Sequence, residues 1–170
     1  MTPKTAFVFD FDGTLVDTAV DLAATTNRLL VTHGRPPRPY EFLRKDAGRG
    51  SEILIPSAFE IERGCDFYHE LRSAFFEDYA AHCADDPQLF PGIEEALLTL
   101  NRKEIPWGIV TNKPARFVEA IAKARPVLQT AIAVFTPENL QNTKPHPEGI
   151  LRVLEVARVK PELAYYFGDD

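Results

Sequence analysis

The residues of this sequence that could do chemistry fall in a few short segments. Asp10 and Asp12 lie at the end of the β-rich run 5–11, and two side chains at this spacing point to the same side of an extended backbone. Further polar groups stand where later apolar runs end, in Thr111-Asn112-Lys113 and in Gly168-Asp169-Asp170. Because the carboxyl ends of parallel strands share one edge of a sheet, we expect these groups to converge there.

Three carboxylates that meet at one place cannot all ionise without a cation. Asp169 would join Asp10 and Asp12, and the cation that suits such oxygen ligands is Mg²⁺ before Ca²⁺. Mg²⁺ also accepts a substrate phosphate, for which Thr111 and Lys144 would be partners. This set predicts phosphoryl transfer to a carboxylate nucleophile, with a second carboxylate that protonates the leaving oxygen and then activates water.

The elements that must position these groups follow from the hydrophobic period. After Pro91-Gly92, helical and β-rich segments alternate, which predicts a parallel sheet with right-handed crossovers. Strands are expected at 5–11, 107–111, 131–135 and 164–167, and helices at 93–100, 116–124 and 147–157. The region 17–86 has helical periodicity alone, with helices expected at 19–33, 39–47, 51–59 and 66–82.

Local signals refine these helices. Ser51 is expected to cap the helix that follows it, and Pro56 to kink or shorten that helix. In the helix 147–157, the residues expected to face the core are Ile150, Leu151 and Leu154.

About 70 helical residues between the first two strands are far more than a loop holds. The predicted fold class is therefore α/β: a Rossmann-like parallel sheet, formed by residues 1–16 and 88–170, with a helical insert at 17–87 after the first strand.

Composition excludes several classes of protein. The 170 residues are 45% hydrophobic and 26% charged, and the net charge is −6. The excess of basic residues that nucleic-acid-binding proteins usually carry is therefore missing. No apolar run approaches the roughly 18 residues of a membrane span, and no signal peptide is expected at the N-terminus. Cys65 and Cys83 are expected to be reduced thiols in a cytoplasmic protein.

Four ordered segments resemble the motifs of the haloacid dehalogenase (HAD) superfamily. They are Phe9-Asp10-Phe11-Asp12-Gly13-Thr14-Leu15-Val16-Asp17-Thr18, Ile109-Val110-Thr111-Asn112-Lys113-Pro114, Lys144-Pro145-His146-Pro147 and Phe167-Gly168-Asp169-Asp170. The resemblance covers nearly the whole chain and implies an α-helical cap for the insert, which closes over the site and selects the substrate.

The same resemblance implies a role for each matched position. Asp10 would be the nucleophile that becomes an aspartyl-phosphate, and Asp12 the general acid and base, whose backbone carbonyl also binds Mg²⁺. Thr111 and the backbone amide of Asn112 would bind phosphoryl oxygens. Lys144 would stabilise the charges of Asp10 and of the phosphate, and Asp169 would bind Mg²⁺.

Within the superfamily, the chain looks most like phosphoglycolate phosphatases, including the branch that acts on N-acetylmuramic acid 6-phosphate. The segments 107–114 and 144–147 carry this narrower likeness. The expected partner is a small-molecule phosphate ester, and the expected assembly is a monomer or a homodimer. Arg49, between Gly48 and Gly50, would bind a substrate carboxylate or would be an ordinary surface arginine.

Simpler interpretations stay open for single residues. The Asp12-Gly13 pair could be only a turn, Thr111 a helix cap, Lys144 a solvated lysine, and Asp169 a frayed end.

Other functions also stay open for the whole chain. A phosphomutase would share the aspartyl-phosphate, whereas a signalling receiver domain carries its phosphorylated aspartate on a later strand. The stop at Asp170, directly after a strand, also suggests a truncated chain and an inactive remnant.

Overall fold

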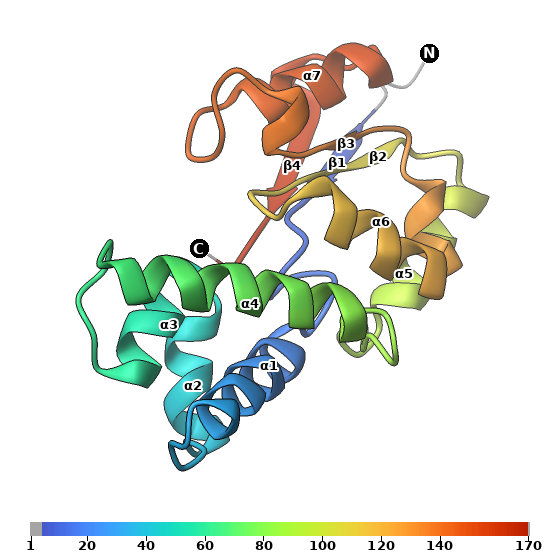
Figure 1. The fold of residues 1–170 in the computed structure, drawn as a ribbon. Coiled ribbons are helices and arrows are strands. Elements are labelled where there is room, and N and C mark those ends of the chain that lie inside the picture. The colour runs from blue at the N-terminus through green and yellow to red at the C-terminus, as the bar shows by residue number, and fades with distance from the viewer. Residues whose placement is uncertain (1–4, 170) are drawn as a thin grey trace. The chain divides into compact units, whose positions relative to one another are not determined.

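Figure 1 shows the fold in a computed structural model, which describes residues 5–169. The chain forms two compact units, an α/β unit of Met1–Asp17 with Pro87–Asp170 and a helical unit of Thr18–Asp86. Each unit is described by itself below.

A four-stranded parallel sheet organises the α/β unit, in the order β3-β2-β1-β4. The expected α/β class with a parallel sheet is confirmed. Its strands are β1 (Ala6–Phe9), β2 (Trp107–Val110), β3 (Val134–Phe135) and β4 (Ala164–Phe167). The helices of this unit are α5 (Ile93–Arg102), α6 (Ala115–Ala124) and α7 (Glu148–Ala157), with 3-10 turns at Pro126–Thr130, Pro137–Asn139 and Pro161–Leu163.

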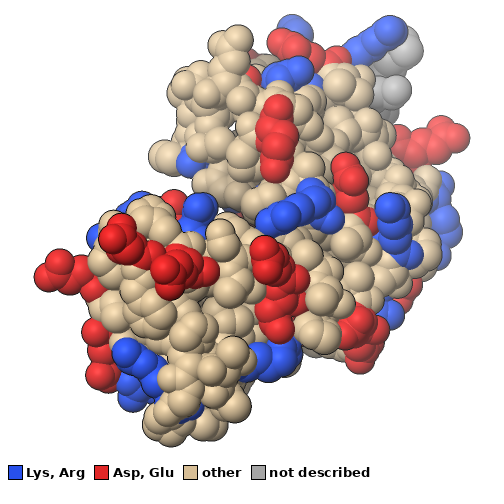
Figure 2. Space-filling view, in the orientation of Figure 1, with Lys and Arg blue, Asp and Glu red and all other residues tan. Residues whose placement is uncertain are grey.

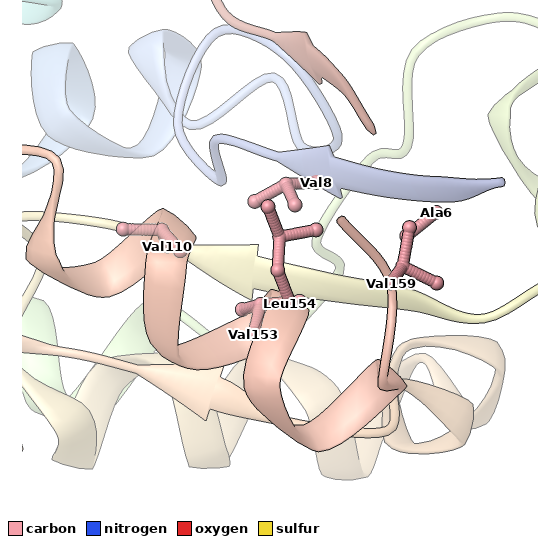
Figure 3. Packing of buried hydrophobic residues seen from close by; sticks show 6 residues of the cluster. All are labelled: Ala6, Val8, Val110, Val153, Leu154 and Val159. Carbon is pink, nitrogen blue, oxygen red and sulfur yellow. The ribbon is translucent and has the colours of Figure 1, made fainter. Parts of the chain in front are cut away.

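Helix α7 packs on one face of the sheet, while α5 and α6 lie on the other (Figure 1). Figure 3 shows the apolar side chains between α7 and the strands, which are Ala6, Val8, Val110, Val153, Leu154 and Val159. Full burial of a valine or leucine side chain stabilises a fold by about 1.5–3 kcal/mol, so this contact fixes α7 firmly. The loop that precedes α7 carries Lys144, which the packing therefore helps to place.

Two glycines make this close contact possible. A Cβ on Gly149, in α7, would lie 2.5 Å from Val110 Cγ1. A Cβ on Gly108, in β2, would lie 2.7 Å from Val153 Cγ1. Real Cβ atoms do not approach other atoms so closely, so side chains at these positions would push the helix away from the sheet.

Aromatic side chains stack on the β1 and β4 side of the sheet. The Phe7 ring stacks on Tyr165 and on Phe167, with ring centroids 5.5 Å and 5.9 Å away. Tyr165 is nevertheless 58% exposed and Phe167 44% exposed. Strand β4 is thus the edge strand of the described sheet and is held to β1 by backbone pairing and ring contact.

The helical unit contains α1 (Ala19–Thr32), α2 (Tyr40–Ala47), α3 (Ser51–Phe59) and α4 (Asp66–His82). Helix α1 packs against each of the other three helices. A salt bridge between Arg28 and Asp78 joins α1 to α4, with Arg28 Nε 2.9 Å from Asp78 Oδ2. In Figure 2, acidic and basic side chains are mixed over the visible surface of both units.

Three local expectations are wrong. Ser51 is the first residue of α3 rather than its cap, because Gly50 takes the capping position with a φ of 80° that favours glycine. The expected shortening of α3 by Pro56 is wrong, since the helix extends to Phe59 with buried side chains on both sides of the proline, whereas the kink stays a prediction. Leu151 is 44% exposed, and Val153 takes its place beside Leu154 as a residue of α7 that is buried in the core.

Candidate active site

The predicted site residues of the α/β unit lie at the carboxyl ends of its strands. Asp10 follows β1, Thr111 follows β2 and Asp169 follows β4 by two residues. The backbone N–H of Asp10 donates to the carbonyl of Phe167 at 2.8 Å, which ties the end of β1 to the end of β4. This arrangement is the usual location of a ligand site in an open parallel sheet.

Asp10 forms an ion pair with Lys144. The side chains of the pair are 10% and 19% exposed, so both charges are largely removed from water. Asp10 Oδ1 also accepts a hydrogen bond from the backbone N–H of Phe11 at 2.6 Å. Lys144 is therefore not a solvated loop lysine: it neutralises a buried carboxylate.

Tyr166 adds a further contact to this lysine. Lys144 Nζ donates to the hydroxyl of Tyr166 at 3.4 Å. Burial by itself would lower the pKa of Lys144, but its hydrogen bond and charge interaction with Asp10, together with smaller contributions from Tyr166, outweigh burial and raise the pKa. The lysine is thus held in its charged form beside the carboxylate.

A second ion pair was not anticipated from the sequence. Lys113 Nζ lies 2.9 Å from Asp12 Oδ1, and the Lys113 side chain is only 5% exposed. These two residues are 101 positions apart, so no local pattern links them. The one signal in the sequence is the place of Lys113 directly after β2, two residues beyond Thr111.

Asn112 acts on the loop that carries Lys144. The backbone N–H of Lys144 donates to Asn112 Oδ1 at 3.0 Å, and Asn112 Nδ2 donates to the carbonyl of Lys144 at 3.2 Å. This reciprocal pair fixes the loop beside the end of β2. Thr111 is 1% exposed, and its hydroxyl accepts the backbone N–H of Lys113 at 3.1 Å. Helix α6 is capped by Pro114, so Thr111 is not its cap.

The Asp12-Gly13 turn receives the carboxylate of Asp169. Gly13 has a φ of 73°, and a Cβ built on it would lie 2.1 Å from Asp169 Oδ2. Only glycine leaves room for the carboxylate in this position. The structure thus places Asp169 against the segment that carries the two predicted catalytic aspartates.

Within residues 5–169, no three His, Cys, Asp or Glu side chains form a cluster that could hold a metal ion. The carboxylates of Asp10 and Asp12 are each directed to a lysine instead. The Mg²⁺ site expected from Asp10, Asp12 and Asp169 therefore stays a prediction. Asp170 lies outside the described residues.

Arg49 belongs to the helical unit, just after α2. Its side chain is 64% exposed, and Arg49 Nη1 lies 3.5 Å from Asp46 Oδ1. A contact this long and exposed restrains the guanidinium only weakly. The expected contact of Arg49 with a substrate carboxylate also stays a prediction.

Known proteins match this chain over nearly its whole length. Residues 7–170 match the family model described as haloacid dehalogenase-like hydrolase. The N-acetylmuramic acid 6-phosphate phosphatase of Pseudomonas putida (strain KT2440) is 32% identical over 165 residues, which are 97% of this chain and 74% of the relative. The phosphoglycolate phosphatase of Psychrobacter arcticus is 31% identical over 173 residues, covering 98% of this chain and 75% of the relative.

Among solved structures, a predicted phosphoglycolate phosphatase from Haemophilus somnus 129pt superposes with a TM-score of 0.84 at 26% identity. The match covers 99% of this chain and 78% of that one. The fold is thus that of a HAD-type hydrolase, and the chain belongs to the haloacid dehalogenase-like hydrolase family. The expected resemblance to its phosphatases is confirmed. Within residues 5–169, no helix has the length and apolar character needed to cross a membrane.

Proposed function

We propose that this protein is a Mg²⁺-dependent phosphatase that hydrolyses a small phosphomonoester through an aspartyl-phosphate on Asp10. The observation that supports it best is the buried carboxylate of Asp10, which is paired with Lys144 at the carboxyl edge of the sheet. A second carboxylate, Asp12, lies two residues away and is available for proton transfer.

In the first step, a carboxylate oxygen of Asp10 forms a bond to phosphorus while the bond from phosphorus to the ester oxygen breaks. Asp12 donates a proton to the departing oxygen, which leaves as an alcohol. The ammonium of Lys144 stabilises the negative charge on the transferring group, and Thr111 with the backbone N–H of Asn112 binds its oxygens.

In the second step, water attacks the phosphorus of the aspartyl-phosphate. Asp12, now a carboxylate, takes a proton from this water as the bond from phosphorus to Asp10 breaks. Inorganic phosphate leaves, and Asp10 returns to its free carboxylate paired with Lys144. The two aspartates therefore have separate roles: Asp10→Asn would stop turnover, whereas Asp12→Asn would leave a residual rate about 10²–10⁴-fold below that of the parent.

The donor set fits Mg²⁺, since all the candidate ligands are oxygens. The residues that would hold the ion are Asp10, Asp169 and the backbone carbonyl of Asp12, and the missing side chain of Gly13 makes room for Asp169. When bound, Mg²⁺ would offset the charge of the phosphoryl group.

The substrate would be phosphoglycolate or N-acetylmuramic acid 6-phosphate, the compounds for which the relatives are named. Both compounds carry a carboxylate in addition to the phosphate. We assign substrate selection to the insert 17–87 as a cap on the core of residues 1–16 and 88–170, with Arg49 as the partner of the substrate carboxylate.

The test is phosphate release from both compounds and from hexose phosphates, with Mg²⁺ and with EDTA. We expect release that needs Mg²⁺ and is lost in Asp10→Asn. An Arg49→Met variant should raise the KM for the carboxylate-bearing substrates and leave that for hexose phosphates unchanged. Release that persists in Asp10→Asn would refute the aspartyl-phosphate. Phosphoenzyme formation without phosphate release would favour a phosphomutase instead.

A further inference from the structure

A buried lysine that the proposed chemistry does not use lies beside the second aspartate. The Lys113 side chain is 5% exposed, whereas the side chain of its partner Asp12 is 30% exposed. The ammonium is thus too deeply buried to bind a substrate, while the carboxylate is not. Any effect of Lys113 on the reaction must pass through a neighbouring group.

Rigid elements fix the position of this ammonium. The backbone N–H of Lys113 donates to the hydroxyl of Thr111, directly after β2. Lys113 Nζ lies 5.9 Å from the ring centroid of Phe117, a residue in the first turn of α6 that is 2% exposed. The lysine is therefore held between the end of a strand and the start of a helix.

We propose that Lys113 is a positioning residue that holds the Asp12 carboxylate in place for proton transfer. This inference rests on the proposed function, in which Asp12 serves as acid and base. Proton transfer requires the two heavy atoms to be about 2.6–3.2 Å apart, and a misplacement of about 1 Å costs on the order of 100-fold in rate. A partly exposed aspartate has several rotamers. The hydrogen bond from the rigidly held ammonium of Lys113 to Asp12 Oδ1 selects one of them, and it can form whether or not the carboxyl carries a proton on Oδ2.

Stability alone does not account for this pair. A buried ion pair contributes no more to stability than apolar residues of the same volume would, because both charges must leave water. Methionine has nearly the shape of lysine without its charge. Lys113→Met leaves the Asp12 carboxylate behind, but this side chain is 30% exposed and water can hydrate it. The variant should therefore fold with a melting temperature close to that of the parent and lose activity nevertheless.

The first experiment compares two phosphate esters. With an alkyl ester such as phosphoglycolate the leaving oxygen needs a proton, whereas the 4-nitrophenolate of 4-nitrophenyl phosphate leaves without one. We expect Lys113→Met to lower kcat/KM about 100-fold for the alkyl ester and less than about 10-fold for 4-nitrophenyl phosphate. Lys123→Met, which removes an exposed lysine at the end of α6, is the matched control and should retain full activity.

The second experiment asks whether Lys113 acts through Asp12. In an Asp12→Asn background, Lys113→Met should cause no further loss of activity, because the group that it positions is already gone. Equal losses for both esters, or losses that multiply in the double variant, would overturn the proposal. Lys113→Gln replaces Lys113→Met if the latter does not fold.

Melting temperatures measured in EDTA test the coupling of Lys113 and Asp12 without relying on catalysis. Asp12→Asn deprives the buried ammonium of this carboxylate and should melt below the parent, and adding Lys113→Met should restore part of the loss. A double variant that melts no higher than Asp12→Asn would refute the coupling of the two residues. If the parent enzyme released no phosphate, the proposed function would fail, and these melting temperatures would still decide whether Lys113 holds Asp12.

Discussion

Substitution of Gly13 by alanine tests whether the Asp12-Gly13 turn seats Asp169. The added Cβ would lie 2.1 Å from Asp169 Oδ2. Carbon and oxygen atoms in contact stay about 3.3 Å apart, so the carboxylate must retreat by about 1.2 Å. An aspartate side chain moves this far at little cost in stability, and the penalty should therefore appear in metal binding rather than in folding.

The expected result is a rise of about 10- to 100-fold in the Mg²⁺ concentration that gives half-maximal phosphate release, the range seen when metal ligands are disturbed. The positive φ of 73° at Gly13 adds a backbone cost of about 1–2 kcal/mol for alanine. At about 2–4 °C per kcal/mol for a chain of this size, the melting temperature should fall by about 2–8 °C.

Gly92→Ala separates the effect of the contact with Asp169 on Mg²⁺ binding from the effect of the positive φ on stability. Gly92 belongs to the same unit and has a φ of 83°, but a Cβ there would meet nothing within 4 Å. This variant should show the same fall in melting temperature with an unchanged Mg²⁺ requirement. If Gly13→Ala and Gly92→Ala needed the same Mg²⁺ concentration, Asp169 would not be a ligand placed by this turn.

Three further predictions concern single contacts. Tyr166→Phe removes the hydroxyl 3.4 Å from Lys144 Nζ and should lower kcat/KM about 3- to 10-fold, whereas Tyr165→Phe on the opposite side of β4 should have no effect in the same assay. Burial by itself would raise the pKa of Asp78, but the hydrogen bond and charge of Arg28 outweigh burial and hold the pKa below 3.8. The stability that this ion pair contributes is complete above about pH 5 and is lost as the pH falls through the lowered pKa. Urea titrations should therefore show a weaker dependence of stability on acid pH in Arg28→Met than in the parent. Gly149→Ala should lower the urea midpoint despite the better helix propensity of alanine, because its Cβ would lie 2.5 Å from a side chain of β2, and an unchanged midpoint would refute the close packing of α7.

Local sequence patterns were sufficient where the residue types along one element are distinctive. The ranges expected for α4 and β4, 66–82 and 164–167, are those observed, since a long amphipathic period and a compact aromatic run leave few alternatives. Local sequence patterns were insufficient where the backbone conformation determines which residue caps a helix. Gly50 rather than Ser51 caps α3 because its φ of 80° is easily reached by glycine, which the order of residues does not reveal.

The sequence by itself determined the class of protein, the order of its elements and the candidate residues, because motif spacing and hydrophobic period are local properties of the chain. Only the tertiary structure decided which charges meet. Lys113 and Asp12, 101 positions apart, form an ion pair because β1 and β2 are neighbours in the sheet and end at the same edge. Lys144 and Tyr166 come together in the same way, through the loop before α7 and the pairing of β4 with β1. Such pairs depend on how strands are ordered in space, and no pattern within one segment encodes that order.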